Sequence, residues 1–432
     1  MVAIALLIAV ELLYLVASGQ LGAMGGLEMA DIAERLVAGV GFSSPYLPVG
    51  EGGATSVSPP LYVWLMSIVY RILGVKTVAS HGFLQCLNIV FNVVTLVLLF
   101  RTCQKLTNET TARVFAILFA LHPHILLIAG SIWETGLSLM LLSTILWLVT
   151  THTTRMHIPT LIALGLLFGL TALSNPAWTI CYPLICLVIL WPDLSRRQDC
   201  IKSIVALAVV VMSYLCVVSP WLLRNYETTG NIMYVRNMAG PELYKGNHEY
   251  AGGGHGFGFN DYWIYKSEEQ RNLYRTLGET NYDQIMKQTS LEYIQTHPGH
   301  YIELILKRVI MWWSGDFDAL NKWYAVADNK KLIFGIVLTI AGVLTSFFTL
   351  YGTWSLRNQA RRFWLVWIYI YFLPIPYYLI IVGFRYQSSL IAFSLIPAAY
   401  CIARAIEKTT SSVPIQSNLT DHATTDPTYP AR

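Results

Sequence analysis

Three acidic residues lie within one short stretch near the start of the chain, GGLEMADIAERLVAGVGFSSP, residues 25–45. Glu28, Asp31 and Glu34 are three residues apart, so a helix over this stretch brings them onto neighbouring turns. A carboxylate held in this way can act as a general base toward a hydroxyl group. The alternative is that all three acids form only the solvated face of an amphipathic helix. Glu28 is the first catalytic candidate and Asp31 is the second.

A fourth acid, Glu134, stands at the start of an apolar run in GSIWETGLSLM. It could meet Glu28 across a cavity, where it would steer a second substrate or bind a divalent cation. The alternative is helix capping, because acids are favoured in the first helical turn by the macrodipole. Glu134 is therefore a third catalytic candidate, and a cofactor stays undetermined.

Two arginines lie beside apolar runs: Arg224, next to Asn225 in SPWLLRNYETTG, and Arg385, next to Tyr386 in GFRYQ. A guanidinium group forms paired hydrogen bonds with phosphate oxygens, so both arginines and Tyr386 are candidates to bind a phosphate or pyrophosphate. The alternative is that the side chains snorkel to a membrane interface.

Four histidines follow in the same polar region as Glu242 and Glu249, but their spacing matches no metal-binding motif, so we predict no metal site. The glycine-rich run AGGGHGFGFND, residues 251–261, is neither GxGxxG after a strand nor a phosphate loop. We interpret it as a flexible flap over a substrate. The histidines are His248, His255, His297 and His300.

The composition identifies the class of protein. Of 432 residues, 55% are hydrophobic and only 12% are charged, against roughly 25% charged in an ordinary soluble domain. The chain is therefore an integral membrane protein. Its net charge of +4 requires no nucleic-acid partner, because Lys and Arg gather after alternate apolar runs. The seven cysteines lie in or beside apolar runs, which argues against a disulfide framework.

We predict an all-α polytopic protein with about ten transmembrane helices, because runs long enough to cross ~30 Å of hydrocarbon recur along the chain. The first run is expected to be a retained span, with a cleaved signal peptide as the alternative. Glu11 within it is expected either to pair with a basic group or to lie near an end. The predicted spans are 1–18, 82–100, 113–130, 134–150, 158–174, 177–192, 203–220, 332–352, 363–381 and 388–406.

Basic residues predict the orientation of these spans, because short cytoplasmic loops are rich in Lys and Arg. Both termini are then cytoplasmic, and the candidate residues lie on the exterior side. We expect residues 1–408 to form one transmembrane domain and residues 409–432 to be a disordered tail. The residues that set this orientation are Arg101, Lys105, Arg113, Arg155, Arg196, Arg197, Lys202, Arg357, Arg361, Arg362, Arg404 and Lys408.

Two exterior segments are too long to be simple turns, and long ordered loops usually carry function. The first, residues 19–81, is expected to contain helices on the membrane surface at 28–40 and 62–74. The second, residues 221–331, is expected to contain another at 301–315, with its tryptophans at headgroup level.

Seven stretches, in order along the chain, resemble polytopic glycosyltransferases of the GT-C class. The likeness is to bacterial family 39 members, which are similar to protein O-mannosyltransferases and lipid A aminoarabinose transferases. The stretches are EMADIAERLVAGVGFSSP (28–45), SPPLYVWLMSIVYRILG (58–74), SIWETGLSLMLL (131–142), LSNPAW (173–178), PWLLRNYETTGNIMYVRNMAGPELYKGNHE (220–249), HPGHYIELILKRVIMWW (297–313) and FRYQSSLIAF (384–393).

The resemblance implies transfer of one sugar from a polyprenyl-phosphate carrier to an acceptor hydroxyl at the exterior face of a bacterial inner membrane. An acid of the first exterior loop, here Glu28, would be the base, and Arg224 and Arg385 would hold the donor phosphate. The acceptor would be a glycan, a lipid or a protein. Within the matching stretch 220–249, the candidates to contact substrate are Asn225, Asn247 and His248.

The chain also departs from the pattern of these enzymes. It has Gly25 and Gly26 where the mannosyl and aminoarabinosyl transferases carry an Asp-Glu pair. Ser58 stands where the aminoarabinose transferases have a lysine, which leaves the donor sugar open. The alternative functions are a transporter or lipid flippase, which should show repeats with broken helices, and a membrane scaffold whose outer loop binds a partner.

Overall fold

The computed structural model describes residues 1–51, 53–152, 157–194, 200–231, 233–256 and 259–411. Within these ranges the regular elements are all helices, and the only strand-like pairing is an isolated bridge between Ser43 and Ala54. The predicted all-α polytopic fold is confirmed. Arg155, Arg196 and Arg197 lie outside the described residues, as does the tail from residue 412 onward.

Four of the described helices are long and apolar enough to cross a membrane. They are α4 (Val78–Leu106), α10 (Cys200–Thr229), α15 (Asn329–Ser355) and α18 (Phe384–Ser411). A fifth candidate is a broken span, in which α5 (Glu109–Leu121) and α6 (Pro123–Gly130) are bent by 51°. The bend falls at Pro123, whose ring cannot continue the hydrogen bonding of α5.

The other predicted spans coincide with shorter apolar helices. All ten predicted segments contain helix. Like segment 113–130, two others are interrupted. Segment 177–192 is interrupted because Pro176 starts a 3₁₀ turn, and segment 363–381 because Pro374 separates two helices. The shorter elements are α1 (Val2–Ala17), α7 (Thr135–Thr151), α8 (Ile158–Ser174), η1 (Pro176–Cys181), α9 (Tyr182–Leu194), η2 (Arg357–Gln359), α16 (Ala360–Tyr371) and α17 (Ile375–Leu379).

Buried polar side chains on α4 hold the first helices together. Asn92 donates a hydrogen bond of 2.6 Å to Glu11 Oε1 on α1. Asn88 donates to the carbonyl of Ser131, 2.6 Å away, just after the broken pair ends. Glu11 is fully buried. Its partner is therefore a neutral amide of the bundle and not the basic group that the sequence allowed.

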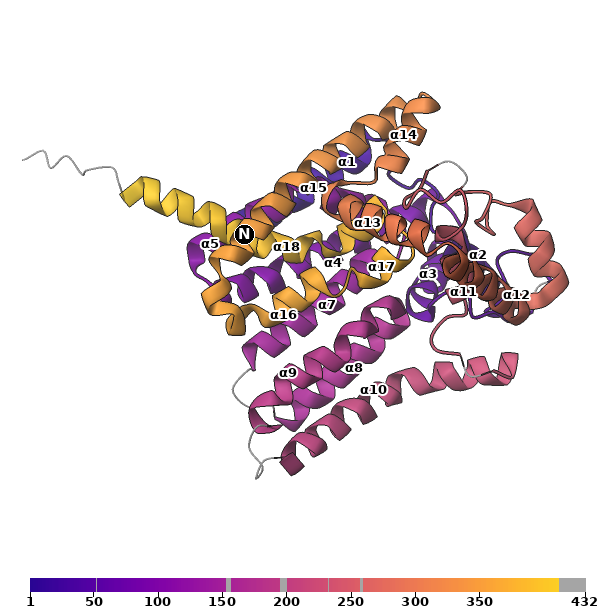
Figure 1. Cartoon of the computed structure of the whole chain (residues 1–432), viewed down its shortest axis with the longest axis horizontal. Helices are drawn as coiled ribbons and strands as arrows, with labels where there is room; N and C mark the ends of the chain where they lie inside the picture. Colours follow the sequence, from indigo (N-terminus) through magenta and orange to yellow (C-terminus); the bar gives the residue numbers. More distant parts are fainter. Residues whose placement is uncertain (52, 153–156, 195–199, 232, 257–258, 412–432) are drawn as a thin grey trace, which may run out of the picture.

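The segments predicted to be exterior are mostly helical and gather at one end of the bundle, opposite α5 and the C-terminal end of α18 (Figure 1). Helices are confirmed in all three predicted surface segments. The elements here are α2 (Leu27–Val37), α3 (Pro60–Leu73), α11 (Ala239–Gly246), α12 (Glu268–Thr296, kinked at Gly278), α13 (Pro298–Ser314) and α14 (Phe317–Ala325).

A second hydrophobic core lies beneath these outer helices, separate from the core of the bundle. Ile32 of α2 packs there with Tyr62 and Met66 of α3, Trp221 of α10 and Tyr282 of α12. The apolar face of α2 is thus buried in protein. This packing fixes the orientation of α2, whose first turn carries Glu28.

Candidate active site

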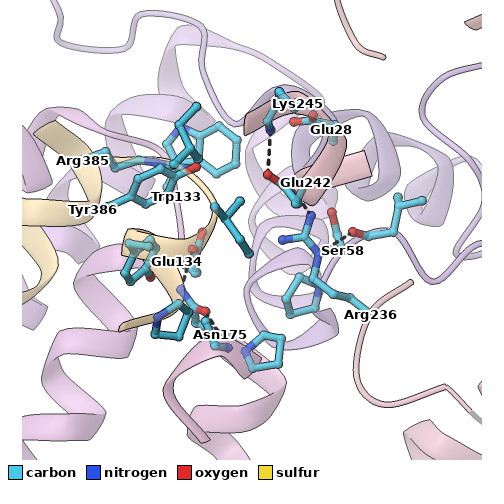
Figure 2. Close-up of a pocket in the computed structure, with 18 of the residues that line it drawn as sticks. Glu28, Ser58, Trp133, Glu134, Asn175, Arg236, Glu242, Lys245, Arg385 and Tyr386 are labelled. Carbon is cyan, nitrogen blue, oxygen red and sulfur yellow. Dashed lines mark hydrogen bonds and ion pairs between the residues drawn. The ribbon is translucent and has the colours of Figure 1, made fainter. Parts of the chain in front are cut away.

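A cavity of about 310 Å³ lies between the bundle and the outer helices. Figure 2 shows its two walls facing each other. The bundle wall comes from the ends of bundle helices and carries Trp133, Glu134, Asn175, Arg385 and Tyr386. The loop wall comes from residues 19–81 and the long loop, and carries Glu28, Ser58, Arg236, Glu242 and Lys245.

Glu28 reaches the cavity because of an unusual turn before α2. Gly26 and Leu27 have φ values of +83° and +36°, a region that L side chains rarely adopt. A Cβ at Gly26 would also crowd the end of Met66. An L side chain at Gly26 would therefore be strained by its backbone conformation.

The surroundings of Glu28 favour its protonated form more than water does. Trp263 Nε1 donates a hydrogen bond of 3.1 Å to Glu28 Oε1. Burial raises the pKa of Glu28 above the ordinary value of 4.5, and hydrogen bonds and the charge of Lys245 oppose this only in part. A carboxylate with a raised pKa accepts a proton from a hydroxyl group more readily, so this environment suits a general base.

Glu242 lies in the same cavity but in the opposite electrostatic state. Its carboxylate is 2.7 Å from Lys245 Nζ and 3.2 Å from Arg236 Nη2. Burial alone would raise the pKa of Glu242, but these two cations outweigh it and lower the pKa to about 2. Glu242 is therefore a permanent anion. Two carboxyl groups whose environments separate their pKa values are suited to different tasks.

Arg385 is held on the bundle wall by aromatic rings. Its guanidinium lies 4.0 Å from the ring centre of Trp133 and 4.9 Å from that of Tyr386. Nη2 donates a hydrogen bond of 3.2 Å to the Tyr386 hydroxyl. Nη1 is buried and has no hydrogen-bond partner among the described residues. The group is thus oriented, with one donor left for an oxygen of a ligand such as phosphate.

Glu134 lies on the same wall and does not cap its helix. It occupies the N-cap position of α7 but makes no side-chain capping hydrogen bond. Asn175 Nδ2 lies 3.4 Å from one carboxylate oxygen, and the other oxygen is buried with no partner among the described residues. The side chain therefore faces the cavity, opposite Glu28 (Figure 2).

Asp31, the second catalytic candidate, does not line the cavity. Its carboxylate lies 2.6 Å from Lys76 Nζ, which also contacts Glu34, and accepts a hydrogen bond of 2.9 Å from Tyr265. These partners occupy Asp31 in joining α2 to the segment after α3. Of the three acids on this helix, only Glu28 reaches the cavity.

Arg224 is also remote from the cavity lining. Its guanidinium donates hydrogen bonds to the backbone carbonyls of Thr55 and Phe42, the latter 2.8 Å away. It also lies 4.8 Å from the ring centre of Trp221. The side chain holds the first exterior segment against α10, so it is not brought to the same site as Arg385.

The three predicted substrate-loop residues likewise lie outside the main cavity. Asn225 accepts a hydrogen bond of 2.9 Å from Ser56. Asn247 accepts one of 3.0 Å from the buried Arg308. His248 stacks on Tyr262 at 3.6 Å between ring centres and lines a small neighbouring pocket. These contacts order the outer loops behind the cavity wall.

The sequence interpretation missed the cations of the loop wall. Lys245 follows Glu242 by three residues in GPELYKG, a spacing at which opposite charges pair on a helix, so a local signal was present. Arg236 offered no comparable signal, because it precedes the helix and reaches Glu242 across a turn. Trp263, which donates a hydrogen bond to Glu28, lies 235 positions from it along the chain, so no local pattern connects the two residues.

The cavity lining shows no ligand set for a divalent cation among the described residues. Glu242 is engaged by two cations and Glu28 by Trp263, and one oxygen of Glu134 is engaged by Asn175. Across the described ranges, no three His, Cys, Asp or Glu side chains lie close enough to hold a metal ion. Carboxylates from several directions are what such ions require, and here the positive charge opposite the acids comes from side chains.

Residues 57–223 match the sequence profile of the dolichyl-phosphate-mannose-protein mannosyltransferase family. No curated protein matches the chain significantly. The match begins beside Ser58 of the loop wall and runs through Trp133, Glu134 and Asn175 of the bundle wall.

Solved structures with a similar fold include the oligosaccharyltransferase of Archaeoglobus fulgidus. Its complex with Zn and sulfate has a TM-score of 0.51 and 14% identity, with 89% of this chain and 45% of that chain covered. Its complex with an inhibitory peptide and a dolichol-phosphate has a TM-score of 0.51 and 14% identity, with 94% and 50% covered. This chain thus spans about half the length of that enzyme.

A weaker likeness is to ArnT from Cupriavidus metallidurans bound to undecaprenyl phosphate, with a TM-score of 0.40, 13% identity, and 94% of this chain and 79% of that chain covered. The family match and the oligosaccharyltransferase fold confirm the resemblance to GT-C glycosyltransferases.

Glu28 and Glu242 should affect stability in opposite directions at neutral pH. The folded-state pKa of Glu242 lies below 4.5, so its stabilisation is present above that pH and is lost as the pH falls toward about 2. The folded-state pKa of Glu28 lies above 4.5, so its contribution is lost as the pH rises. At pH ~7, Glu242→Gln should therefore destabilise the protein by about 3 kcal/mol, whereas Glu28→Gln should stabilise it.

Thermal unfolding of the purified protein in lipid nanodiscs measures both effects. The deficit of Glu242→Gln should shrink between pH ~7 and pH ~4, where the wild-type carboxylate begins to lose its advantage. A Glu28→Gln protein that unfolds at a lower temperature than wild type at neutral pH would contradict the assigned electrostatic state of Glu28.

Proposed function

We propose that this chain, as a GT-C glycosyltransferase, moves one sugar from a polyprenyl-phosphate-linked donor to an acceptor hydroxyl. The observation that carries the proposal is one cavity that holds Glu28, with its raised pKa, opposite Arg385, with its unpartnered donor. The dolichol-phosphate bound to the oligosaccharyltransferase of similar fold supports a lipid phosphate as the ligand.

The reaction is a direct displacement at the anomeric carbon. Glu28 takes the proton of the acceptor hydroxyl, and the oxygen attacks the sugar from the side of the loop wall. The bond to the phosphate breaks on the bundle side, where Arg385 and Tyr386 stabilise the departing negative charge. Attack and departure on opposite sides lead to inversion of configuration.

The position of the basic residues supports an exterior cavity. Lys105 Nζ donates to the carbonyl of Thr151 at 3.0 Å, Arg362 contacts the backbone of Lys105, and Asn108 contacts Glu407. The basic ends of several spans thus meet on one side, and short loops rich in Lys and Arg are usually cytoplasmic. The cavity at the other ends of these helices would then face the exterior of a bacterial inner membrane, with residues 1–408 acting as one domain.

Replacement of the base should abolish turnover without abolishing donor binding. Glu28→Gln keeps the shape of the side chain but cannot accept the proton, so kcat should fall by roughly 10²–10⁴-fold. The measurement is release of polyprenyl phosphate from a panel of synthetic polyprenyl-phosphate sugars, with a membrane extract as acceptor source. The same panel identifies the sugar.

Asp31→Asn is the matched control, because Asp31 lies on the same helix but is paired with Lys76 outside the cavity. It should retain release within about threefold of wild type, since a partly exposed ion pair contributes little. If the wild type binds a donor of the panel but releases polyprenyl phosphate from none of them, the result would instead favour a transporter or flippase.

The two candidate arginines should separate into different roles. Arg385→Gln removes a charge-assisted hydrogen bond of about 1.5–3 kcal/mol, so it should weaken donor binding by roughly 10–100-fold. Arg224→Gln should lower the unfolding temperature, because it releases two backbone carbonyls of the first exterior segment. Equilibrium binding of a fluorescent polyprenyl-phosphate sugar and thermal unfolding, measured on both variants, distinguish the roles; a donor-binding loss confined to Arg224→Gln would refute this assignment.

A further inference from the structure

A histidine paired with a buried aspartate lies beside Tyr386 in the cavity. His255 lines the cavity, and its Nδ1 is 3.0 Å from Asp316 Oδ2. Asp316 is only 1% exposed. The His255 ring lies 5.9 Å from that of Tyr386, the neighbour of Arg385. The proposed mechanism does not yet use this pair.

Glycines in the run and at Gly383 allow the backbone to lie close to His255, Asp316 and Asp318. A Cβ at Gly254 would overlap Asp316, one at Gly252 would overlap Asp318, and one at Gly383 would overlap the His255 ring. The Gly254 amide donates a hydrogen bond of 2.9 Å to Asp318. Gly252 and Gly254 of this run therefore allow close approach of the backbone to α14. Whether the run acts as a flexible flap over a substrate stays a prediction.

The charged side chains that line the cavity do not balance the charge of a phosphate ligand. The described residues that line the cavity include three acids and three strongly basic side chains, which balance: Glu28, Glu134 and Glu242 against Arg236, Lys245 and Arg385. A phosphodiester donor adds one negative charge, and the phosphate monoester that leaves carries up to two, because its second pKa is about 6. His255 is the remaining described lining residue with an imidazole side chain, which can donate a proton to a phosphate oxygen.

We propose that His255 binds the leaving polyprenyl phosphate and donates a proton to it, with Asp316 as the positioning residue. The inference rests on the proposed glycosyl transfer. Because Asp316 accepts the hydrogen bond from Nδ1, Nε2 is the nitrogen that exchanges a proton with the ligand. The buried carboxylate also stabilises the imidazolium.

The step balances. The acceptor O–H proton passes to Glu28 as the new glycosidic bond forms, and the electron pair of the breaking bond goes to the phosphate oxygen. The imidazolium of His255 then gives its Nε2 proton to the monoester. Water returns a proton to His255 and removes the one on Glu28, so donor and alcohol become glycoside and polyprenyl hydrogen phosphate.

The charged neighbours of His255 come from two elements besides its own loop. Asp316 and Asp318, at the start of α14, place negative charge near the His255 ring, and Arg385, next to Tyr386 on α18, places positive charge in the same cavity. Lys322 of α14 donates to the carbonyl of Gly256 at 3.4 Å. The Asp316 contact is the only direct ion pair recorded for His255 within the described chain.

Calorimetric titration of the full-length protein in nanodiscs with a soluble short-chain polyprenyl phosphate, which carries no sugar, tests the proposal. Titrations in buffers of different ionisation enthalpy measure the protons taken up on binding. Near pH ~7 the wild type should take up a proton, and its affinity should fall by roughly tenfold as the pH rises from ~6 to ~8.

His255→Gln should lose both the proton uptake and the pH dependence while keeping the wild-type affinity at pH ~8 within about twofold. Asp316→Asn should reduce the uptake, and it should fold, because asparagine also caps a helix such as α14. His297→Gln, at an exposed histidine between α12 and α13, is the control and should behave as wild type.

Unchanged proton uptake in His255→Gln, or an equal loss of affinity at every pH, would overturn the proposal and leave the pair as an anchor for the loop. Failure of the glycosyl-transfer proposal is distinguishable, because binding of the monoester and its linked proton need no turnover. The protein could bind the monoester with proton uptake that depends on His255 and still release no polyprenyl phosphate from any sugar donor. That result would support the His255 site and contradict the glycosyl-transfer proposal.

Discussion

The pairing of Glu242 with Lys245 and Arg236 is the interaction on which the electrostatics of the cavity depend. Both cations also interact electrostatically with Glu28. The charge of Lys245 acts on the Glu28 carboxyl group, and the charge of Glu28 acts on the Arg236 guanidinium. Because Glu242 binds both cations directly, the side-chain donor to Glu28 is a neutral indole N–H, and the pKa of Glu28 is raised. Without Glu242, Lys245 would be free to pair with Glu28 and weaken it as a base.

The same division of charge separates scaffold from site elsewhere in the outer region. Asp31 and Arg224 are each satisfied by partners within the scaffold, Lys76 for one and backbone carbonyls for the other. Arg385 is oriented by aromatic rings and retains an unpartnered donor. Charged groups already satisfied by the scaffold cost little to keep but offer little to a ligand, whereas an oriented group with a remaining donor is prepared for one.

The sequence predicted most of the helices and about half of the site, for identifiable reasons. Apolar periodicity is a local property, so all ten segments were found as helices, but a proline such as Pro123 converts a span into two elements by an angle that composition does not contain. Glu134 and Arg385 were found because they stand at the ends of apolar runs. Arg224 carries the same local signal as Arg385, and only the packing of the first exterior segment distinguishes them.

The central claim is that Glu28 and Arg385 act on one ligand from opposite walls of the cavity. A structure of the protein in nanodiscs with a non-cleavable polyprenyl phosphonate sugar tests this most directly. The account predicts phosphonate oxygens within hydrogen-bond distance of Arg385 Nη1 and a sugar whose anomeric carbon faces the Glu28 wall. A phosphonate seated at Arg224, or a sugar directed away from Glu28, would contradict it.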